Sequence, residues 1–158
     1  MKEIVLIKVK DFGEIEVIIE NKEAPITVEN FLNLVKENYY DNSSFHRVIS
    51  GFMIQGGIGR NNAKPIVGEF SSNNIANNLK HQRGVISMAR TMVPNSATSQ
   101  FFIMHENSPH LDNNYASFGY VTKGIEVVDK IAGVETDHND KPLKPVIIES
   151  IRIIENKS

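Results

Sequence analysis

The stretch that decides the fold is Phe45-His46-Arg47-Val48-Ile49-Ser50-Gly51-Phe52-Met53-Ile54-Gln55-Gly56-Gly57. Its aromatic and β-branched residues predict two short strands, residues 45–49 and 53–55, followed by a Gly-Gly break. Arg47 stands alone among apolar neighbours, and an isolated charge in such company is costly unless it has partners or a chemical task. Arginine is also the scarcer cation, with 5 Arg against 12 Lys. We therefore expect Arg47 to serve as a fork-shaped, permanently charged hydrogen-bond donor.

The segment before this stretch predicts a β-hairpin and a helix. Residues 4–10 and 14–19 are rich in Ile and Val, and Asp11-Phe12-Gly13 between them is typical of a turn. Further along, apolar residues recur at i, i+3, i+4 and i+7, which predicts a helix with one buried stripe made of Val28, Phe31, Leu32 and Val35. Pro25 suits the start of this helix and Asn38 suits its end.

Beyond residue 57 the chain alternates short apolar runs with polar loops. The runs predict strands at residues 84–89, 99–104, 116–121 and 146–154, and a second short helix at residues 125–131. Roughly eight strands with two separated helices predict a mainly β fold, a closed antiparallel barrel whose open ends are capped by the helices. Because no repeat, linker or low-complexity tract interrupts the pattern, we expect residues 1–158 to form a single domain.

Composition excludes several classes of function. The chain has 158 residues, 41% of them hydrophobic, and a net charge of −2, so no basic field favours nucleic acid or anionic lipid. Without cysteine it can form no disulfide, thiolate nucleophile or Cys-based metal site. No segment approaches the roughly 20 apolar residues of a membrane helix, and no signal-peptide pattern is present. We expect a cytoplasmic protein that binds neither nucleic acid nor membranes.

Motifs for covalent, acid–base and metal catalysis are missing. The five histidines form no His-x3-His pair, no Gly-x-Ser-x-Gly elbow occurs, and residues 56–59 lack the Lys-Ser/Thr of a phosphate loop. Asp112 and Asp129 are isolated carboxylates, more typical of turns or of the surface than of catalytic pairs. A metal site could still assemble in three dimensions, but the sequence indicates none, and we expect no cofactor. Any activity should therefore work by binding and polarisation.

Several separated motifs resemble those of the cyclophilin-type peptidyl-prolyl cis–trans isomerases. The opening stretch is similar to the family signature, and the likeness continues in order along nearly the whole chain. The other matching segments are Ala24-Pro25-Ile26-Thr27-Val28-Glu29-Asn30-Phe31, Gly84-Val85-Ile86-Ser87-Met88-Ala89, Ser99-Gln100-Phe101-Phe102-Ile103, Leu111-Asp112 and Phe118-Gly119. Ala89-Arg90-Thr91 is similar to the compact bacterial branch. The resemblance implies an eight-stranded barrel with two capping helices, in agreement with the pattern above.

The resemblance also implies an activity, its partners and its residues. It implies an isomerase that accelerates rotation about Xaa-Pro bonds in peptides and unfolded proteins and so assists folding, acting as a monomer. Arg47 would donate to the prolyl nitrogen, Phe52 and Phe102 would line a proline pocket, and Gln55 would help to hold Arg47 and the substrate. The positions implied to bind substrate are Met53, Ala89, Arg90, Gln100, His110, Leu111 and Tyr115. His110 stands where many eukaryotic relatives have Trp, so we expect any cyclosporin binding to be weakened.

Each of these residues also has an ordinary structural interpretation. Without the motif, the apolar ones would be core residues, Gln55 and Gln100 would face solvent, and Arg47 could form a salt bridge. His81 and His138 are interpreted as loop histidines. The alternative functions are a non-catalytic proline-peptide docking module and, more distantly, a carbohydrate- or nucleotide-binding barrel. The intact guanidinium favours the isomerase, since a pure binder need not keep it.

Overall fold

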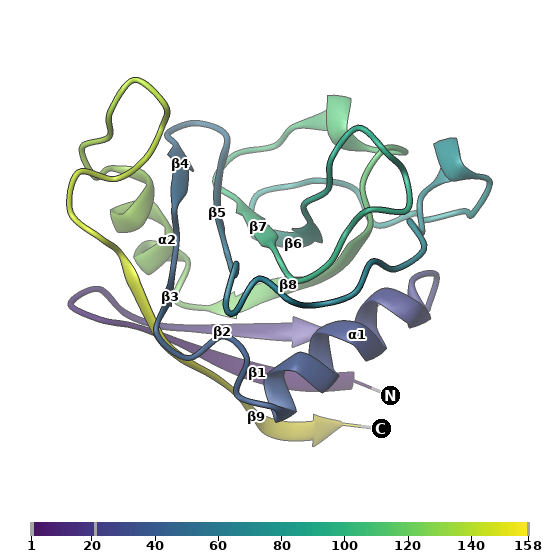
Figure 1. Ribbon diagram of the computed structural model, residues 1–158, viewed down its shortest axis with the longest axis horizontal. Coiled ribbons are helices and arrows are strands. Elements are labelled where there is room, and N and C mark those ends of the chain that lie inside the picture. Colours follow the sequence, from purple (N-terminus) through teal and green to yellow (C-terminus); the bar gives the residue numbers. More distant parts are fainter. Residues whose placement is uncertain (1, 21, 158) are drawn as a thin grey trace.

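The predicted N-terminal hairpin is present in the computed structural model, which describes residues 2–20 and 22–157 (Figure 1). Strands β1 (Lys2–Val9) and β2 (Gly13–Ile19) pair antiparallel. The turn between them has positive φ at Asp11 (68°) and at Gly13 (127°), which a short polar side chain and a glycine tolerate. The turn residues recognised in the sequence are therefore those that reverse the chain.

All nine strands belong to one antiparallel sheet that curls on itself (Figure 1). Besides β1 and β2 they are β3 (Ser43–Ser44), β4 (Arg47–Ile49), β5 (Met53–Gly56), β6 (Val85–Met88), β7 (Phe101–Met104), β8 (Ser117–Lys123) and β9 (Ile147–Lys157). The strands are hydrogen-bonded in the order β3-β9-β1-β2-β8-β6-β7-β5-β4. The two edge strands, β3 and β4, are neighbours in the chain, so the sheet must curve until its edges approach each other.

The prediction of a mainly β, barrel-like fold with two helices is confirmed, with a difference in how the sheet closes. Strand β3 pairs with β9, whereas β4 pairs with β5, and only Phe45 and His46 join the two edges. Among the described residues no ladder links β3 to β4, so the sheet is a curled half-barrel of nine strands rather than a closed barrel of eight. The relative direction of the two edge strands explains why they do not pair. In an antiparallel sheet with an odd number of strands the two edges run parallel, and a parallel pair needs a crossover of about a dozen residues.

Both predicted helices form and lie at opposite sides of the sheet (Figure 1). Helix α1 (Pro25–Lys36) packs against β9, and α2 (Ile125–Ala132) packs against β2, β4 and β5. Most of the stripe predicted for α1 is buried, and α2 buries the three apolar residues predicted for it, Val127, Val128 and Ile131. Tertiary packing of these apolar faces, more than intrinsic propensity, stabilises such short helices.

The N-terminus of α1 is capped from a distant loop. Ala24 precedes the helix and offers no side-chain cap. Instead the buried carboxylate of Glu69 accepts hydrogen bonds from the backbone N–H groups of Thr27 (2.6 Å) and Ile26 (3.2 Å). A negative charge is stabilising at this end of the helix dipole, so Glu69 ties its loop to α1.

An aromatic cluster around Phe101 fills the interior of the curled sheet. Its ring meets those of Phe31, Tyr40 and Phe45 edge-on at centroid distances of 5.8, 5.5 and 6.0 Å. Gly57 has a φ of +92°, and a Cβ there would lie 2.8 Å from the Phe101 ring. The second glycine of the Gly-Gly break is therefore needed for both backbone conformation and space.

Alternation along β4, β5 and β7 creates a second apolar cluster, on the outer face of the sheet. Val48, Ile54 and Ile103 point into the main core. The alternate residues on the same strands point outward. The fully buried members of this outer cluster are Met53, Val85, Phe102, Met104 and Leu111. The outer face of a barrel normally meets water, so a buried apolar cluster on that face indicates a candidate site.

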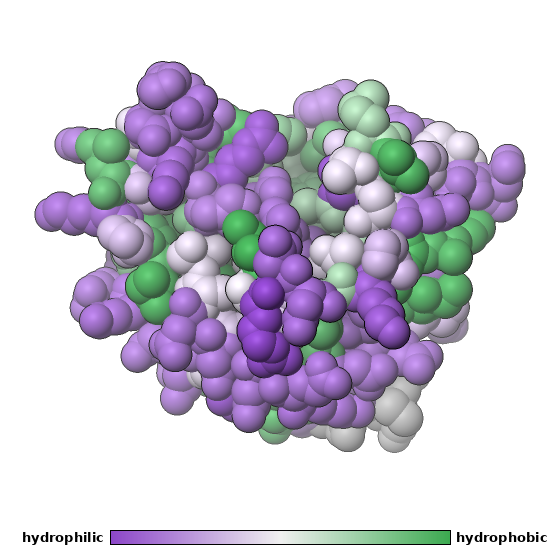
Figure 2. Space-filling view, in the orientation of Figure 1, coloured by the Kyte–Doolittle hydropathy of each residue, from purple (hydrophilic) through white to green (hydrophobic). Residues whose placement is uncertain are grey.

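One face of the surface can be followed in Figure 2. The face seen in Figure 2 is mostly hydrophilic, with small separate apolar patches. Within the described residues, no helix combines the length and the apolar character needed to span a bilayer.

Candidate functional site

A row of residues crosses four strands on the outer face. Arg47 on β4 lies opposite Gln55 on β5, Gln55 lies opposite Phe102 on β7, and Phe102 lies opposite Ser87 on β6. Residues directly opposite each other in antiparallel strands share a face, with Cβ atoms about 5 Å apart. The sheet therefore places a guanidinium, an amide and an aromatic ring side by side, although they come from separate parts of the sequence.

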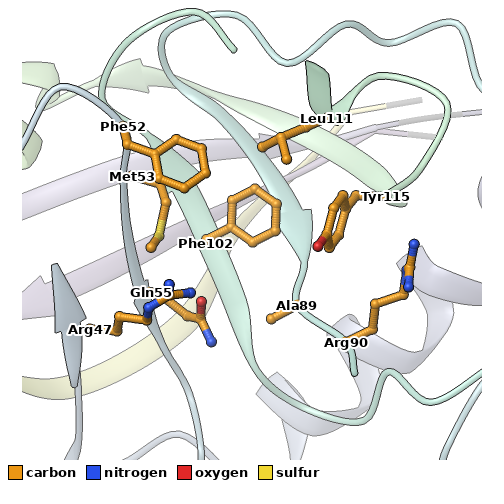
Figure 3. A pocket seen from close by; sticks show the side chains of 9 residues that line it. All are labelled: Arg47, Phe52, Met53, Gln55, Ala89, Arg90, Phe102, Leu111 and Tyr115. Carbon is orange, nitrogen blue, oxygen red and sulfur yellow. The ribbon is translucent and has the colours of Figure 1, made fainter. Parts of the chain in front are cut away.

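A cavity of about 110 Å³ opens onto this row (Figure 3). It is lined by Arg47, Phe52, Met53, Gln55, Ala89, Arg90, Phe102, Leu111 and Tyr115, all of them among the residues that the resemblance implied. In Figure 3 the aromatic and aliphatic side chains surround one part of the cavity, and Arg47 and Gln55 lie together beside it. The volume is below the 300–1,000 Å³ or so of pockets for drug-sized ligands, which argues against a nucleotide- or sugar-binding barrel.

Arg47 is exposed and has no carboxylate partner within the described part of the chain. Arg47 therefore forms no structural salt bridge with the described residues. The expectation that its charge would be costly in apolar sequence is wrong, because strand alternation buries Val48 and leaves Arg47 on the opposite face. An exposed, permanently charged donor beside an apolar cavity can polarise a lone pair held there.

Gln55 connects this cavity with a second one. Its Nε2 donates to Oε1 of Gln100 (3.1 Å), and the backbone N–H of Ala89 donates to the carbonyl of Gln100 (3.0 Å). The adjoining cavity, about 250 Å³, is lined by Gln55, Ala89, Arg90, Thr91, Ser96 and Gln100. Gln100 thus belongs to the neighbouring cavity rather than the first. Three shared residues separate the two cavities, so one extended peptide could occupy both.

Aromatic rings form the walls of the first cavity. The Phe102 ring meets Tyr115 nearly at right angles, with centroids 5.6 Å apart. The Phe52 ring lies 5.7 Å from the His110 ring, tilted by 31°. His110 belongs to the 3-10 turn η2 (Pro109–Leu111) and does not line the first cavity. It therefore supports Phe52 from the rim, while Leu111 contributes directly to the wall.

Arg90 is held in place by aromatic rings and carbonyl groups. Its guanidinium lies 4.7 Å from the ring centroids of both Phe70 and Tyr115. It donates to the carbonyl of Asn114 from Nε (3.0 Å) and Nη2 (2.6 Å), and to that of Thr91 from Nη1 (2.9 Å). The substrate-binding role implied for Arg90 stays a prediction, and its contacts show that it also holds Tyr115.

A buried histidine stands behind Phe102. The Nδ1–H of His81 donates to Oδ1 of Asp112 and its Nε2 accepts from the Ser87 hydroxyl, both at 2.9 Å. The imidazole stacks on the Phe102 ring at a centroid distance of 6.0 Å. Burial lowers the pKa of His81 and so favours the neutral ring, in which one nitrogen donates and the other accepts. His81 therefore links three segments that surround the cavity.

This support was not predicted from the sequence. His81 does lie in a loop, as predicted, but it is 2% exposed, and Asp112, which lies in a turn as expected, also anchors it. The available signal was Ser87, a polar residue inside an apolar strand. A buried hydroxyl needs a partner, but the sequence does not say which.

His46 lies at the join between the two sheet edges. It is half-buried, and burial lowers its pKa. His46 is therefore a second histidine near the site whose neutral form is favoured by its surroundings.

Other kinds of site find less support. Across residues 2–20 and 22–157, no group of three or more His, Asp or Glu side chains is arranged to hold a metal ion. A larger cavity, about 490 Å³, lies between Phe12 at the tip of the first hairpin and the loop around Leu143, and none of the predicted site residues lines it.

Comparison with known proteins gives a consistent result. The family model described as cyclophilin-type peptidyl-prolyl cis-trans isomerase/CLD matches residues 4–153. Peptidyl-prolyl cis-trans isomerase B of Escherichia coli (strain K12) is 43% identical over 156 residues, covering 90% of this chain and 95% of that protein. Peptidyl-prolyl cis-trans isomerase A of Dickeya dadantii is 43% identical over 152 residues, covering 90% and 80%.

Solved structures agree with these relatives. A Cryptosporidium parvum cyclophilin-type peptidyl-prolyl cis-trans isomerase has a TM-score of 0.87 at 30% identity, covering 99% of this chain and 100% of that one. A second structure of that protein, determined in the presence of the dipeptide Ala-Pro, has a TM-score of 0.86 at 31% identity and covers 98% and 100%.

Proposed function

The chain belongs to the family of cyclophilin-type peptidyl-prolyl cis–trans isomerases, and from this premise we propose that it accelerates rotation about Xaa-Pro bonds by means of Arg47. Members of this family are isomerases, and the curated relatives compared above carry that name. The proposal concerns the mechanism. Arg47 donates a hydrogen bond to the prolyl nitrogen while the apolar cavity holds the proline ring.

The chemistry of the bond explains why one donor can be effective. Conjugation of the prolyl nitrogen with the carbonyl gives a rotation barrier of about 18–20 kcal/mol. Twisting removes the conjugation and leaves a nitrogen lone pair that can accept a hydrogen bond. A fixed donor to that nitrogen stabilises the twisted state more than either planar state, and such a difference lowers the barrier. No bond is made or broken, so neither nucleophile nor metal is required.

The observation that carries the proposal is the Arg47 guanidinium, which has no carboxylate partner among the described residues and lies in one row with Gln55 and Phe102. Phe52, Met53, Phe102 and Leu111 offer the ring an apolar wall, and Gln55 orients the substrate carbonyl. A well-placed charged donor contributing about 3 kcal/mol gives on the order of a hundredfold in rate. Desolvation and restriction of the bound proline supply the rest.

The test compares variants on a short Ala-Pro-Phe-type peptide, in a protease-coupled or NMR exchange assay. Arg47→Ala should lower kcat/KM about a hundredfold with its fold intact by circular dichroism. Arg47→Lys keeps the charge without the planar fork, and its kcat/KM should lie between those of wild type and Arg47→Ala. Arg60→Ala is the matched control, because Arg60 rests on the Tyr39 ring and lines neither cavity.

Two outcomes would redirect the proposal. A wild-type protein that binds the peptide but does not accelerate exchange would be a docking module. A folded Arg47→Ala variant with full activity would leave the isomerase but remove Arg47 from its mechanism.

The cellular role belongs to the same proposal. We propose that the protein assists folding by acting on flexible or unfolded chains as a monomer in the cytoplasm, and that residues 1–158 act as one domain. Sedimentation analysis and fractionation of the producing cells test the two statements.

A further inference from the structure

Arg83, His105 and Asp129 form a cluster of charged and hydrogen-bonding side chains outside the cavity. A tight turn connects this cluster with the cavity. The turn joins β4 to β5 and is closed by the Phe52 N–H donating to the Ile49 carbonyl (3.0 Å). Gly51 within it has a φ of +80°, a conformation that glycine adopts without strain. The turn carries Phe52 directly, and the strands on either side carry Arg47 and Gln55. Its position therefore controls three residues of the site.

His105, which follows β7, holds this turn twice. Its backbone N–H donates to the Phe52 carbonyl (2.9 Å), and its Nδ1 accepts from the Gly51 N–H (2.8 Å). Because a backbone N–H can only donate, Nδ1 must carry the lone pair, and the ring proton sits on Nε2. The side chain of His105 is 16% exposed, whereas Gly51 at the tip of the turn is exposed.

The other side of the imidazole is fixed by α2. Nε2 of His105 lies 3.2 Å from Oδ1 of Asp129, and Arg83 holds that carboxylate through bonds of 2.6 and 2.7 Å. Nη1 of Arg83 also donates to the His105 carbonyl (2.9 Å). The result is a continuous chain of contacts from α2 through the imidazole to the turn. Neither His105 nor Asp129 lines the cavity.

We propose that His105 is a positioning residue, whose neutral imidazole is aligned by Asp129 and holds the Gly51 turn so that Phe52 stays against the substrate proline. This inference rests on the proposed function, because it concerns the same cavity. It also predicts a response to acid. Protonation places a hydrogen on Nδ1, which then faces the Gly51 N–H and cannot accept from it. The charged groups around the ring are Arg83, Asp129 and, next in the chain, Glu106.

The test uses the full chain, two substitutions and a matched control. His105→Ala removes the acceptor for Gly51. His105→Asn keeps an acceptor close to the place of Nδ1 but has no group that protonates near neutral pH. Asp41→Asn breaks the ion pair between Asp41 and Arg152, which has the same two-bond geometry (2.8 and 2.9 Å) and lies outside both cavities. KM and kcat are measured by NMR exchange on an Xaa-Pro peptide between pH 5 and 8.

At pH 8 we expect His105→Ala to lose about fivefold in kcat/KM, mainly through a higher KM, and His105→Asn to stay within about twofold of wild type. Wild type should lose activity on acidification, because a protonated Nδ1 no longer accepts from the Gly51 N–H, and that acid limb should be absent from His105→Asn. The other four histidines are present in both proteins, so the difference between the profiles isolates His105. Asp41→Asn should alter the unfolding temperature without changing KM or the profile.

Equal pH profiles for wild type and His105→Asn, or an equal rise in KM for Asp41→Asn, would overturn the inference. Inactivity of wild type would instead refute the proposed function. The inference would then be judged by the Gly51 amide and Phe52 ring resonances. They should shift as His105 titrates in wild type and stay constant in His105→Asn, and unchanged resonances in wild type would overturn it.

Discussion

Replacing His81 by Ala should destabilise the protein strongly, because this buried ring satisfies two polar groups at once. The substitution removes the hydrogen bond from Nδ1 to Asp112 and the one that Nε2 accepts from Ser87. Ser87 is fully buried, so its hydroxyl loses its imidazole acceptor away from bulk water. The stack on Phe102 is lost as well.

The expected loss in the free energy of unfolding is about 4 kcal/mol. The bond to the charged Asp112 contributes roughly 2 kcal/mol, and the stranded Ser87 hydroxyl roughly another 2 kcal/mol. For a chain of this length each kcal/mol lowers Tm by about 2–4 °C, so Tm should fall by about 8–16 °C. Such a change is a large fraction of the total stability of a typical domain.

Urea denaturation and calorimetry of His81→Ala, His81→Phe and His138→Ala test this reasoning. His138 is exposed, so its replacement should change stability by no more than about 0.5 kcal/mol. His81→Phe keeps an aromatic ring against Phe102 but makes neither hydrogen bond, and it should be nearly as unstable as His81→Ala. A His81→Phe variant as stable as wild type would show that packing, rather than hydrogen bonding, accounts for the role of His81.

Two further predictions concern acid and cyclosporin. Burial lowers the folded-state pKa of His81 and His46 below the ordinary 6.5, so the unfolded chain binds protons that the folded chain does not. The free energy of unfolding should therefore fall as pH drops below about 6.5. Urea titrations at pH 5, 6 and 7 that give equal free energies of unfolding would contradict this prediction. For cyclosporin, His110→Trp should tighten binding about tenfold by enlarging the ring surface beside Phe52, and calorimetry that gives an unchanged Kd would refute the attribution of weak binding to His110.

Local patterns predicted most of the secondary structure. The turn at Asp11 to Gly13, the stripe around Phe31 and the apolar face of α2 depend on residues close in sequence, and all three form as expected. Closure of the sheet was predicted less well. The choice of partner by β3 and β4 depends on the parity of the whole sheet, which no local pattern contains.

The candidate site, like the fold, was predicted only in part. The resemblance indicated the nine residues that the structure brings to one cavity, although their individual roles stay predictions. It did not indicate that His81 supports Phe102, or that His105 holds the turn before Phe52. Both histidines looked ordinary because their partners lie on distant segments.

By itself, the sequence determined which segments become strands, turns and helices and which family the chain resembles, because periodicity and motif order are properties of neighbouring residues. Only the tertiary structure decided that Arg47 lies on the open face with no ion-pair partner within the described residues, in line with Gln55 and Phe102. It also decided which imidazoles lie behind the cavity. These features depend on strand register and on contacts between segments far apart in the chain, which form only when the whole sheet curls and its core packs.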